Sequence, residues 1–208
     1  MTNTNVSTRL ATIRTRRPWP WAIGWALIPV LFAAIGFGYA QSQQFDDRRT
    51  YLATAAAVTA AALVGLIRML SSRIGLSRFG FRRPAAGSAR PLIWFAPLAL
   101  GPVLVAATTG IAVDRALIPG FVWLAAAAAF SEEIWYRGIV MATLRQRSRR
   151  TAIVGSAVIF GVLHLANLFG GASPLYAGLQ LAFAALFGLV AALVVEHSGS
   201  LWPAIAWH

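Results

Sequence analysis

Three ionisable side chains interrupt an otherwise apolar stretch in the second half of the chain. Glu132 and Glu133 follow a run of alanines, and Arg137 comes four residues after Glu133. Residues four apart share one face of a helix, so Glu133 and Arg137 can pair and neutralise each other. Glu132 points about 100° away around the same helix and lacks that partner. A carboxylate left unpaired in a dry site is a candidate general base, which would take a proton from a reacting water.

Imidazoles that could work with this carboxylate occur further along the chain. His164 lies in another apolar stretch, four residues after Phe160, whose ring could form one wall of the pocket that holds the imidazole. Gly161 would let a neighbouring helix come close, and Asn167 could orient the His164 ring or bind a substrate. His208 is a further imidazole that could work with Glu132. By contrast, Glu196 and His197 stand near a predicted helix end, where we expect a solvated cap.

The composition places these residues in a membrane. The chain has 208 residues, of which 58% are hydrophobic, and a soluble domain of this size could not bury so much apolar surface. We therefore predict an all-α fold, a polytopic bundle of about six full transmembrane helices. The alanine-rich second span has a small-residue face suited to close packing. The expected spans are Trp19–Ala40, Tyr51–Leu70, Pro91–Val113, Gly120–Leu144, Thr151–Phe169 and Pro174–Val195, each near the ~20 residues that cross a bilayer. A seventh helix would begin near Ser200 and is too short to cross.

Counting residues along these spans predicts that the candidate groups share one level. Glu132 lies 13 residues before Arg145, and His164 lies 13 residues after Thr151. At 1.5 Å per residue, both would sit roughly 20 Å from the arginine-rich turn that joins their two helices. His208 would approach the same layer from the same side, about 12 Å deep by the same rise. Ionisable groups at such depth are rare and usually functional.

Arginines divide unequally between the predicted loops. Fourteen lie in or beside the N-terminal tail, the loop at 71–90 and the turn at 145–150, which alternate along the chain with less basic loops. The fourteen are Arg9, Arg14, Arg16, Arg17, Arg68, Arg73, Arg78, Arg82, Arg83, Arg90, Arg145, Arg147, Arg149 and Arg150. The other loops hold Arg48, Arg49 and Arg115, each near an aspartate. The positive-inside rule then predicts a cytoplasmic N-terminus.

Charge and cysteine content exclude several classes of protein and site. The net charge of +12 comes from arginines between apolar runs, a pattern typical of contact with lipid headgroups, and we do not expect nucleic acid as a partner. The chain has no cysteine, which excludes disulfides and thiolate metal sites. Zinc stays open as a cofactor, because Glu132, His164 and His208 could supply the ligands of a three-residue site. The sequence has no H-E-x-x-H motif that would favour it.

Three short patterns resemble the motifs of a known family. They are E-E-x-x-x-R at Glu132, Glu133 and Arg137, F-x-x-x-H at Phe160 and His164, and "GSLWPAIAWH" ending in His208. Together they resemble the CPBP family, the CAAX prenyl endopeptidases and bacteriocin-processing enzymes also called the ABI family, over about residues 117–208. The resemblance implies an intramembrane protease in which Glu132 and His164 activate a water. It also implies that His208 helps to stabilise the oxyanion, in a glutamate- or metal-dependent reaction.

One departure from the family pattern concerns its third motif. The family has an asparagine four residues after the histidine, whereas this sequence ends at His208, so we expect a truncated chain. The resemblance divides the chain into a basic cytoplasmic tail at 1–18, N-terminal transmembrane helices at 19–116 with a basic loop near 71–90, and a catalytic core at 117–208. A missing oxyanion donor typically lowers a rate by about 10²–10³-fold, which puts the activity of this form in doubt.

The leading hypothesis is therefore an intramembrane endopeptidase that hydrolyses a membrane-associated peptide or protein, with or without a lipid attached. The expected location is a bacterial cytoplasmic membrane, and membrane lipids are expected partners. Two alternatives stay open: a non-catalytic immunity or scaffold protein of the same fold, and a transporter or proton-relay subunit. Buried glutamate and histidine also serve in transporters, although these more often show duplicated halves.

Overall fold

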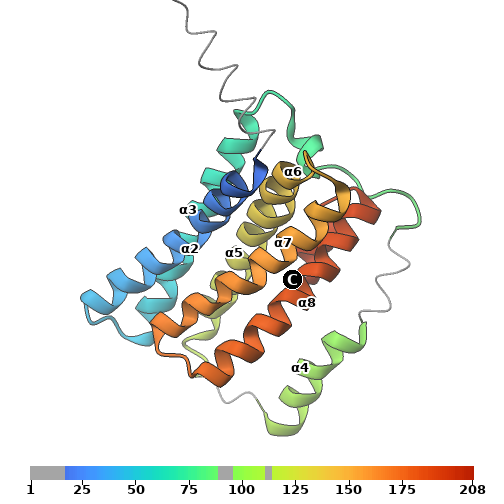
Figure 1. Cartoon of the computed structure of the whole chain (residues 1–208). Helices are drawn as coiled ribbons and strands as arrows, with labels where there is room; N and C mark the ends of the chain where they lie inside the picture. Colours follow the sequence, from blue (N-terminus) through green and yellow to red (C-terminus); the bar gives the residue numbers. More distant parts are fainter. Residues whose placement is uncertain (1–16, 89–95, 111–113) are drawn as a thin grey trace, which may run out of the picture.

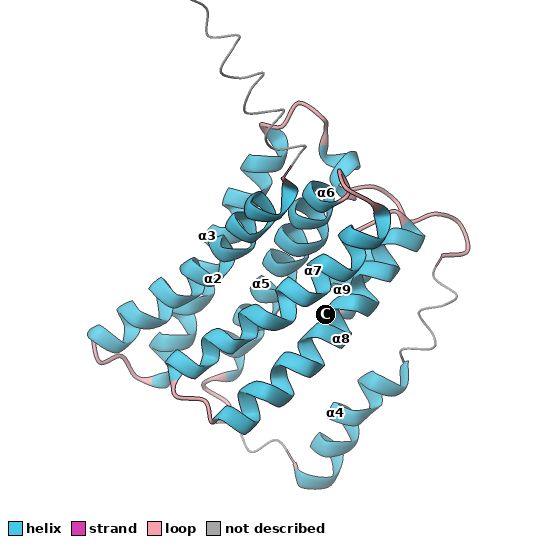
Figure 2. Cartoon of the chain, viewed as in Figure 1, coloured by secondary structure: helices cyan, strands magenta, loops and turns pink. Residues whose placement is uncertain are grey.

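The computed structural model describes residues 17–88, 96–110 and 114–208, and these form helices, turns and loops without a strand (Figure 2). The α-helices are α2 (Pro18–Ser42), α3 (Asp47–Leu70), α4 (Ala96–Thr109), α5 (Ile118–Glu132), α6 (Met141–Leu144), α7 (Arg149–Leu163), α8 (Pro174–Ser198) and α9 (Trp202–Trp207). A π-helix, η3 (Glu133–Val140), joins α5 to α6. Two 3₁₀-helices are η1 (Leu76–Phe79) and η4 (His164–Gly170).

Four helical segments in the described part of the chain are long and apolar enough to cross a membrane. They are α2, α3, α7 together with η4, and α8. The chain is thus a helical membrane protein, as its composition predicts. Within the expected span at 91–113 the structure describes α4, which has 14 residues, and both ends of that span lie outside the described residues. The expected span at 120–144 corresponds to α5, η3 and α6, which continue one another without a break. The count of six spans stays a prediction.

Local chemistry explains where several helices begin. Asp46, Ser148 and Ser173 precede α3, α7 and α8, and the side chain of each accepts a hydrogen bond from a backbone N–H of the first turn. These N–H groups have no partner inside their own helix, so a capping oxygen stabilises the helix start. Proline near the first position of α2 and α8 adds to the effect, because proline is preorganised for that place.

The small-residue face of α3 is buried, as predicted. Its buried residues include Ala55, Ala61, Ala62 and Gly65. A Cβ atom on Gly65 would lie 2.6 Å from Cγ2 of Ile134, so only glycine lets α3 approach η3 this closely. Small residues at helix contacts let backbones come together where lipid gives no hydrophobic driving force.

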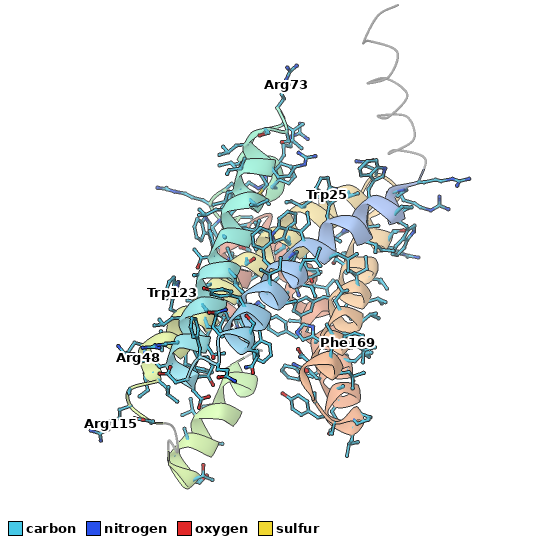
Figure 3. All side chains as sticks on the ribbon, turned by 90° about the vertical axis from the view of Figure 1, so that its left-hand side faces the viewer. Trp25, Arg48, Arg73, Arg115, Trp123 and Phe169 are labelled. Carbon is cyan, nitrogen blue, oxygen red and sulfur yellow. The ribbon has the colours of Figure 1, made fainter. Side chains whose placement is uncertain are left out.

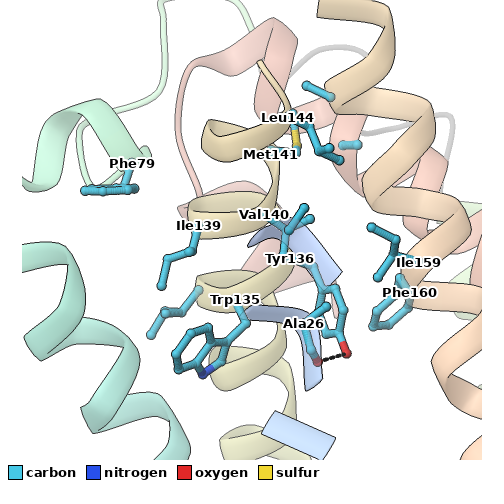
Figure 4. Close-up of a cluster of buried hydrophobic side chains, with 14 of the residues drawn as sticks. Ala26, Phe79, Trp135, Tyr136, Ile139, Val140, Met141, Leu144, Ile159 and Phe160 are labelled. Carbon is cyan, nitrogen blue, oxygen red and sulfur yellow. Dashed lines mark hydrogen bonds between the residues drawn. The ribbon is translucent and has the colours of Figure 1, made fainter. Parts of the chain in front are cut away.

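The main core surrounds η3 and ties it to the first two helices. Trp135 and Tyr136 of η3 are buried, and both side chains donate to backbone oxygens of other helices. Trp135 Nε1 donates to the oxygen of Ala61 at 3.0 Å, and the Tyr136 hydroxyl donates to the oxygen of Ala26 at 3.2 Å (Figure 4). These bonds fix the rotation of η3, the segment that carries Glu133 and Arg137.

Helices α7 and α8 lie antiparallel and side by side (Figure 1). A Cβ atom on Gly161 would lie 2.7 Å from Cβ of Ala185 and 2.9 Å from the oxygen of Leu181. Gly161 therefore allows close helix contact, as the sequence predicts.

The end of α8 differs from the solvated cap that the sequence suggests. The Glu196 side chain is only 11% exposed and pairs with two arginines. Its carboxylate lies 2.8 Å from Nε of Arg149 and also contacts Arg145. Because α8 runs antiparallel to α7, its last turn lies beside the turn at 145–148, and the ion pairs join them. His197, next along the chain, is exposed.

The arginine-rich segments gather at one end of the bundle. The start of α2, the loop that follows α3 and the turn before α7 share that end (Figure 1). Arg73 lies there, whereas Arg48 and Arg115 lie at the opposite end (Figure 3). This arrangement is the one that the alternation of basic and less basic loops predicts. That the basic end faces the cytoplasm stays a prediction.

Candidate active site

The expected pair between Glu133 and Arg137 is present and fully enclosed. Nη1 of Arg137 donates to Oε1 of Glu133 at 2.9 Å, and both side chains are 0% exposed. The guanidinium also lies over aromatic rings, 4.4 Å from the centroid of Phe160 and 5.8 Å from that of Phe187. Rings placed in this way attract a cation, so the arginine charge is compensated on several sides.

His208 lies against both glutamates. Its Nδ1 is 3.0 Å from Oε1 of Glu133, and its Nε2 is 3.6 Å from Oε2 of Glu132. Glu132 thus has a histidine beside it, whereas the helix spacing alone left this carboxylate without a partner. The sequence brings His208 to the right level but could not show this contact, because it depends on how α9 folds back onto η3.

The two neighbouring glutamates have different surroundings. The Glu132 side chain is 26% exposed, whereas that of Glu133 is 0% exposed. The first carboxylate is therefore open at the surface of the bundle, while the second is enclosed between Arg137 and His208. This contrast follows from the approximately 100° that separates consecutive residues on a helix.

The His164 ring is held in one orientation. Its Nδ1 lies 2.8 Å from the backbone oxygen of Phe160. A carbonyl oxygen can only accept, so Nδ1 carries the proton and the lone pair of Nε2 is available. The Phe160 ring packs edge-on against His164 at 4.6 Å between centroids and lies 6.2 Å from His208. Both imidazoles therefore contact one phenylalanine, and the charge of Glu132 interacts with both of them.

Asn167 has a different partner from the one that we expected. Its amide donates to Oε1 of Gln180 on α8 at 2.7 Å. Nδ1 of His164 bonds to the Phe160 carbonyl, and a role of Asn167 in orienting the ring or in binding a substrate stays a prediction. Asn167 and Gln180 join η4 to α8, and the position of Gln180 could not be inferred from the spacing within one helix.

The metal ligands that the sequence allows do not gather into a cluster. Among the described residues, no three His, Asp or Glu side chains are placed to hold a metal ion. Both ring nitrogens of His208 face carboxylates, and Nδ1 of His164 faces the carbonyl oxygen of Phe160. Zinc bound by Glu132, His164 and His208 stays a prediction.

The geometry can now be compared with known proteins. Residues 114–208 match the family described as Rce1-like, type II CAAX prenyl endopeptidase. This part of the chain is similar to the CAAX protease family. The resemblance to the CPBP enzymes is thereby confirmed over this range. No curated protein and no solved structure shows a significant match to the chain.

The CAAX protease match contains all the candidate residues from Glu132 to His208. It also contains an aromatic neighbour that the sequence did not reveal, because Phe187 on α8 lies 4.6 Å from the His208 ring. One phenylalanine in a long apolar helix resembles any lipid-facing residue, so no pattern could have singled it out. Helices α2 and α3 lie outside the CAAX protease match, although they contact η3 through Ala26 and Ala61.

Proposed function

We propose that the protein is an intramembrane endopeptidase that hydrolyses a peptide bond in a membrane-associated peptide or protein. The observation that supports this most directly is the contrast between the two glutamates. Glu133 is paired with Arg137 and enclosed, while Glu132 is partly exposed and lies beside the His208 imidazole. A CAAX protease family match around these residues makes hydrolysis the reaction to test first.

In this proposal Glu132 is the general base. It takes a proton from a water molecule, and the water oxygen attacks the carbonyl carbon of the scissile bond. The carbonyl oxygen becomes an oxyanion, which collapses as the bond to nitrogen breaks, and Glu132 passes the proton that it took from the water to the leaving amine. His164, whose Nε2 lone pair is available, holds or accepts a proton of the same water. His208 donates a hydrogen bond to the oxyanion, a role that rests on the family resemblance.

Buried polar atoms beside the carboxylates support a hydrated site. Oε2 of Glu133 and the Nε and Nη2 atoms of Arg137 are buried and make no hydrogen bond within the described part of the chain. Buried atoms of this kind usually bond to ordered water. Such water would lie next to the carboxylate that we assign as the base.

A non-catalytic membrane protein of the same fold is the second candidate. The contacts among Glu133, Arg137 and His208 compensate one another, as they would in a purely structural cluster. This candidate predicts that loss of the Glu132 carboxylate changes no turnover, because there is none.

A peptidase assay separates the two candidates. The purified chain in liposomes is incubated with fluorogenic peptides anchored in the membrane, in prenylated and non-prenylated forms, with and without a chelator. Cleavage that Glu132→Gln abolishes supports the protease. Absence of cleavage across both peptide forms, by a folded protein, favours the non-catalytic candidate. Loss of cleavage with chelator would show metal dependence, and the glutamate mechanism would then be wrong.

A further inference from the structure

The short helix α9 carries His208 to the glutamates and needs support from elsewhere. It has six residues, Trp202–Trp207, and His208 follows directly. The contacts that hold α9 therefore decide where the His208 imidazole lies.

A loop far away in the sequence holds the start of α9 through its backbone. The N–H of Leu201 donates to the oxygen of Gly80 at 2.9 Å. In the other direction, the N–H of Ala85 donates to the oxygen of Ser198 at 2.9 Å. We call residues 80–85 the bracing loop, and these two bonds place it along the junction between α8 and α9.

Side chains strengthen the same junction. Nε of Arg82 donates to the oxygen of Gly199 at 2.5 Å, and the hydroxyl of Ser200 donates to the oxygen of Arg82 at 2.6 Å. Gly199 has a φ of +67°, and a Cβ atom there would meet the guanidinium of Arg82. Arg82 thus closes the turn between the two helices at its glycine.

Apolar side chains also pack the bracing loop against the start of α9. Leu201 is 0% exposed, and a Cβ atom on Gly80 would lie 2.9 Å from its Cγ. The Phe81 ring packs edge-on against Trp202 at 5.6 Å and against Phe130 of α5 at 6.3 Å. The loop therefore contacts both α5, which ends at Glu132, and α9, which His208 follows.

We propose that the bracing loop positions α9, and that Arg82 is a positioning residue for His208. The loop lies before residue 114, outside the family match, so a segment from the first half of the chain would set the geometry of the site. When the contact of Arg82 with Gly199 is lost, α9 opens more often and His208 leaves the carboxylates. The catalytic consequence rests on the proposed function, whereas the structural consequence does not.

Cysteine labelling measures the position of α9 without any cleavage. The chain has no cysteine, and Ala204 on α9 is 2% exposed, so Ala204→Cys reports opening of this helix. Adding Arg82→Ala should speed maleimide labelling about tenfold, the factor that corresponds to weakening one hydrogen bond from a charged donor at an exposed site. Arg82→Lys should give an intermediate rate. Ser200→Ala removes the hydroxyl that donates to the backbone oxygen of Arg82, so this variant should also raise the rate.

Two controls make the result specific. Arg83→Ala removes the same charge from the next residue, which makes no hydrogen bond or ion pair within the described residues, and should leave labelling unchanged. Ala157→Cys on α7, 4% exposed, should stay slow in the Arg82→Ala background. An unchanged rate at position 204, an equal effect of Arg83→Ala, or faster labelling at position 157 as well would overturn the proposal.

Turnover adds a separate test. If the chain cleaves a peptide, Arg82→Ala should lower kcat and leave KM nearly unchanged, with partial recovery in Arg82→Lys. A raised KM at constant kcat would show that Arg82 binds substrate, and would contradict a positioning role. If no variant cleaves anything but labelling at position 204 rises as expected, the bracing role stands and the protease proposal fails.

Discussion

Glu132 and Glu133 show how adjacent residues of one type acquire different chemistry in a membrane protein. An ion in a low-dielectric interior is stable only if a charge or several dipoles compensate it. Glu133 has this compensation from Arg137 and His208. The Glu132 side chain stays partly exposed, and exposure is what a group that exchanges protons with a substrate requires.

The first prediction concerns the proposed base. Glu132→Gln keeps the side-chain shape but removes the proton acceptor, so cleavage should fall by about 10²–10⁴-fold, the usual contribution of general-base catalysis. Turnover of a membrane-anchored peptide measures the effect, and an unaltered melting temperature in detergent shows that the fold is intact. Wild-type turnover in this variant would mean that another group is the base.

The second prediction concerns the enclosed pair. Glu133→Gln leaves the Arg137 charge without its carboxylate at a site where both side chains are 0% exposed. Breaking a buried ion pair on one side typically costs about 3–5 kcal/mol, so the free energy of unfolding should fall by that order. Denaturant unfolding in detergent measures it, with Glu132→Gln as the matched control. Equal stability of the two variants would contradict our division of roles.

Spacing within single helices predicted much of the site at the residue scale. The Glu133–Arg137 pair and the Phe160–His164 contact both follow from i,i+4 geometry, and both are present. The partners of His208, Asn167 and Glu196 could not be predicted in this way. Each lies on a different helix, and its position depends on how two helices rotate against each other.

At the scale of helices, glycines set the distances between axes. Of the two glycines described between α7 and α8, Gly161 makes the closer contact. A Cβ atom there would meet Ala185 and the backbone oxygen of Leu181. Gly161 follows Phe160, so any separation of the two helices displaces the ring that both imidazoles contact.

The third prediction follows from that contact. Gly161→Ala should lower the free energy of unfolding by about 1–3 kcal/mol, the usual cost of overpacking, and should reduce turnover by displacing Phe160. Gly178→Ala is the matched control on α8, where a new Cβ meets nothing within 4 Å. That variant should be neutral or more stable by up to about 1 kcal/mol, because alanine favours helix. A stability ranking in the opposite order would contradict the role assigned to Gly161.

For the whole molecule, the distribution of arginine predicts orientation. Arg73 stands at one end of the bundle and Arg48 and Arg115 at the other (Figure 3). Arginine near a span is retained on the cytoplasmic side during insertion. The N-terminus should therefore be cytoplasmic.

Single cysteines in this cysteine-free chain test that fourth prediction. Gln43 and Ser77 are both exposed. Gln43 precedes α3 and Ser77 follows it, so the two residues flank opposite ends of this helix. In intact cells an impermeant maleimide should label Gln43→Cys but not Ser77→Cys, and inverted vesicles should give the reverse. Labelling of both positions from one side would exclude the predicted topology.

The class of protein followed from composition, whereas the relation between the two halves of the chain did not. Apolar content alone predicts a helical membrane protein, and four helical segments among the described residues meet the requirements for a span. The sequence divides the chain near residue 116. The structure places buried hydrogen bonds across this division, from Trp135 to Ala61 and from Tyr136 to Ala26. The acceptors of these bonds are backbone oxygens, which every residue has, so no residue type in the sequence marks them.

Those two bonds have a consequence for how the protein is made. The hairpin of α2 and α3 is synthesised first, and it presents the oxygens of Ala26 and Ala61 as acceptors before the second half arrives. A fragment of residues 114–208 expressed alone would leave the two donors, Trp135 and Tyr136, without these partners, at a cost of roughly 1–3 kcal/mol each. It should be degraded rapidly in cells and accumulate when residues 1–113 are supplied as a second polypeptide, as pulse-chase labelling can measure. Equal lifetimes with and without the first fragment would show that the second half matures unaided. Rescue would mean that the first hairpin serves as an assembly template for the half that bears the glutamates.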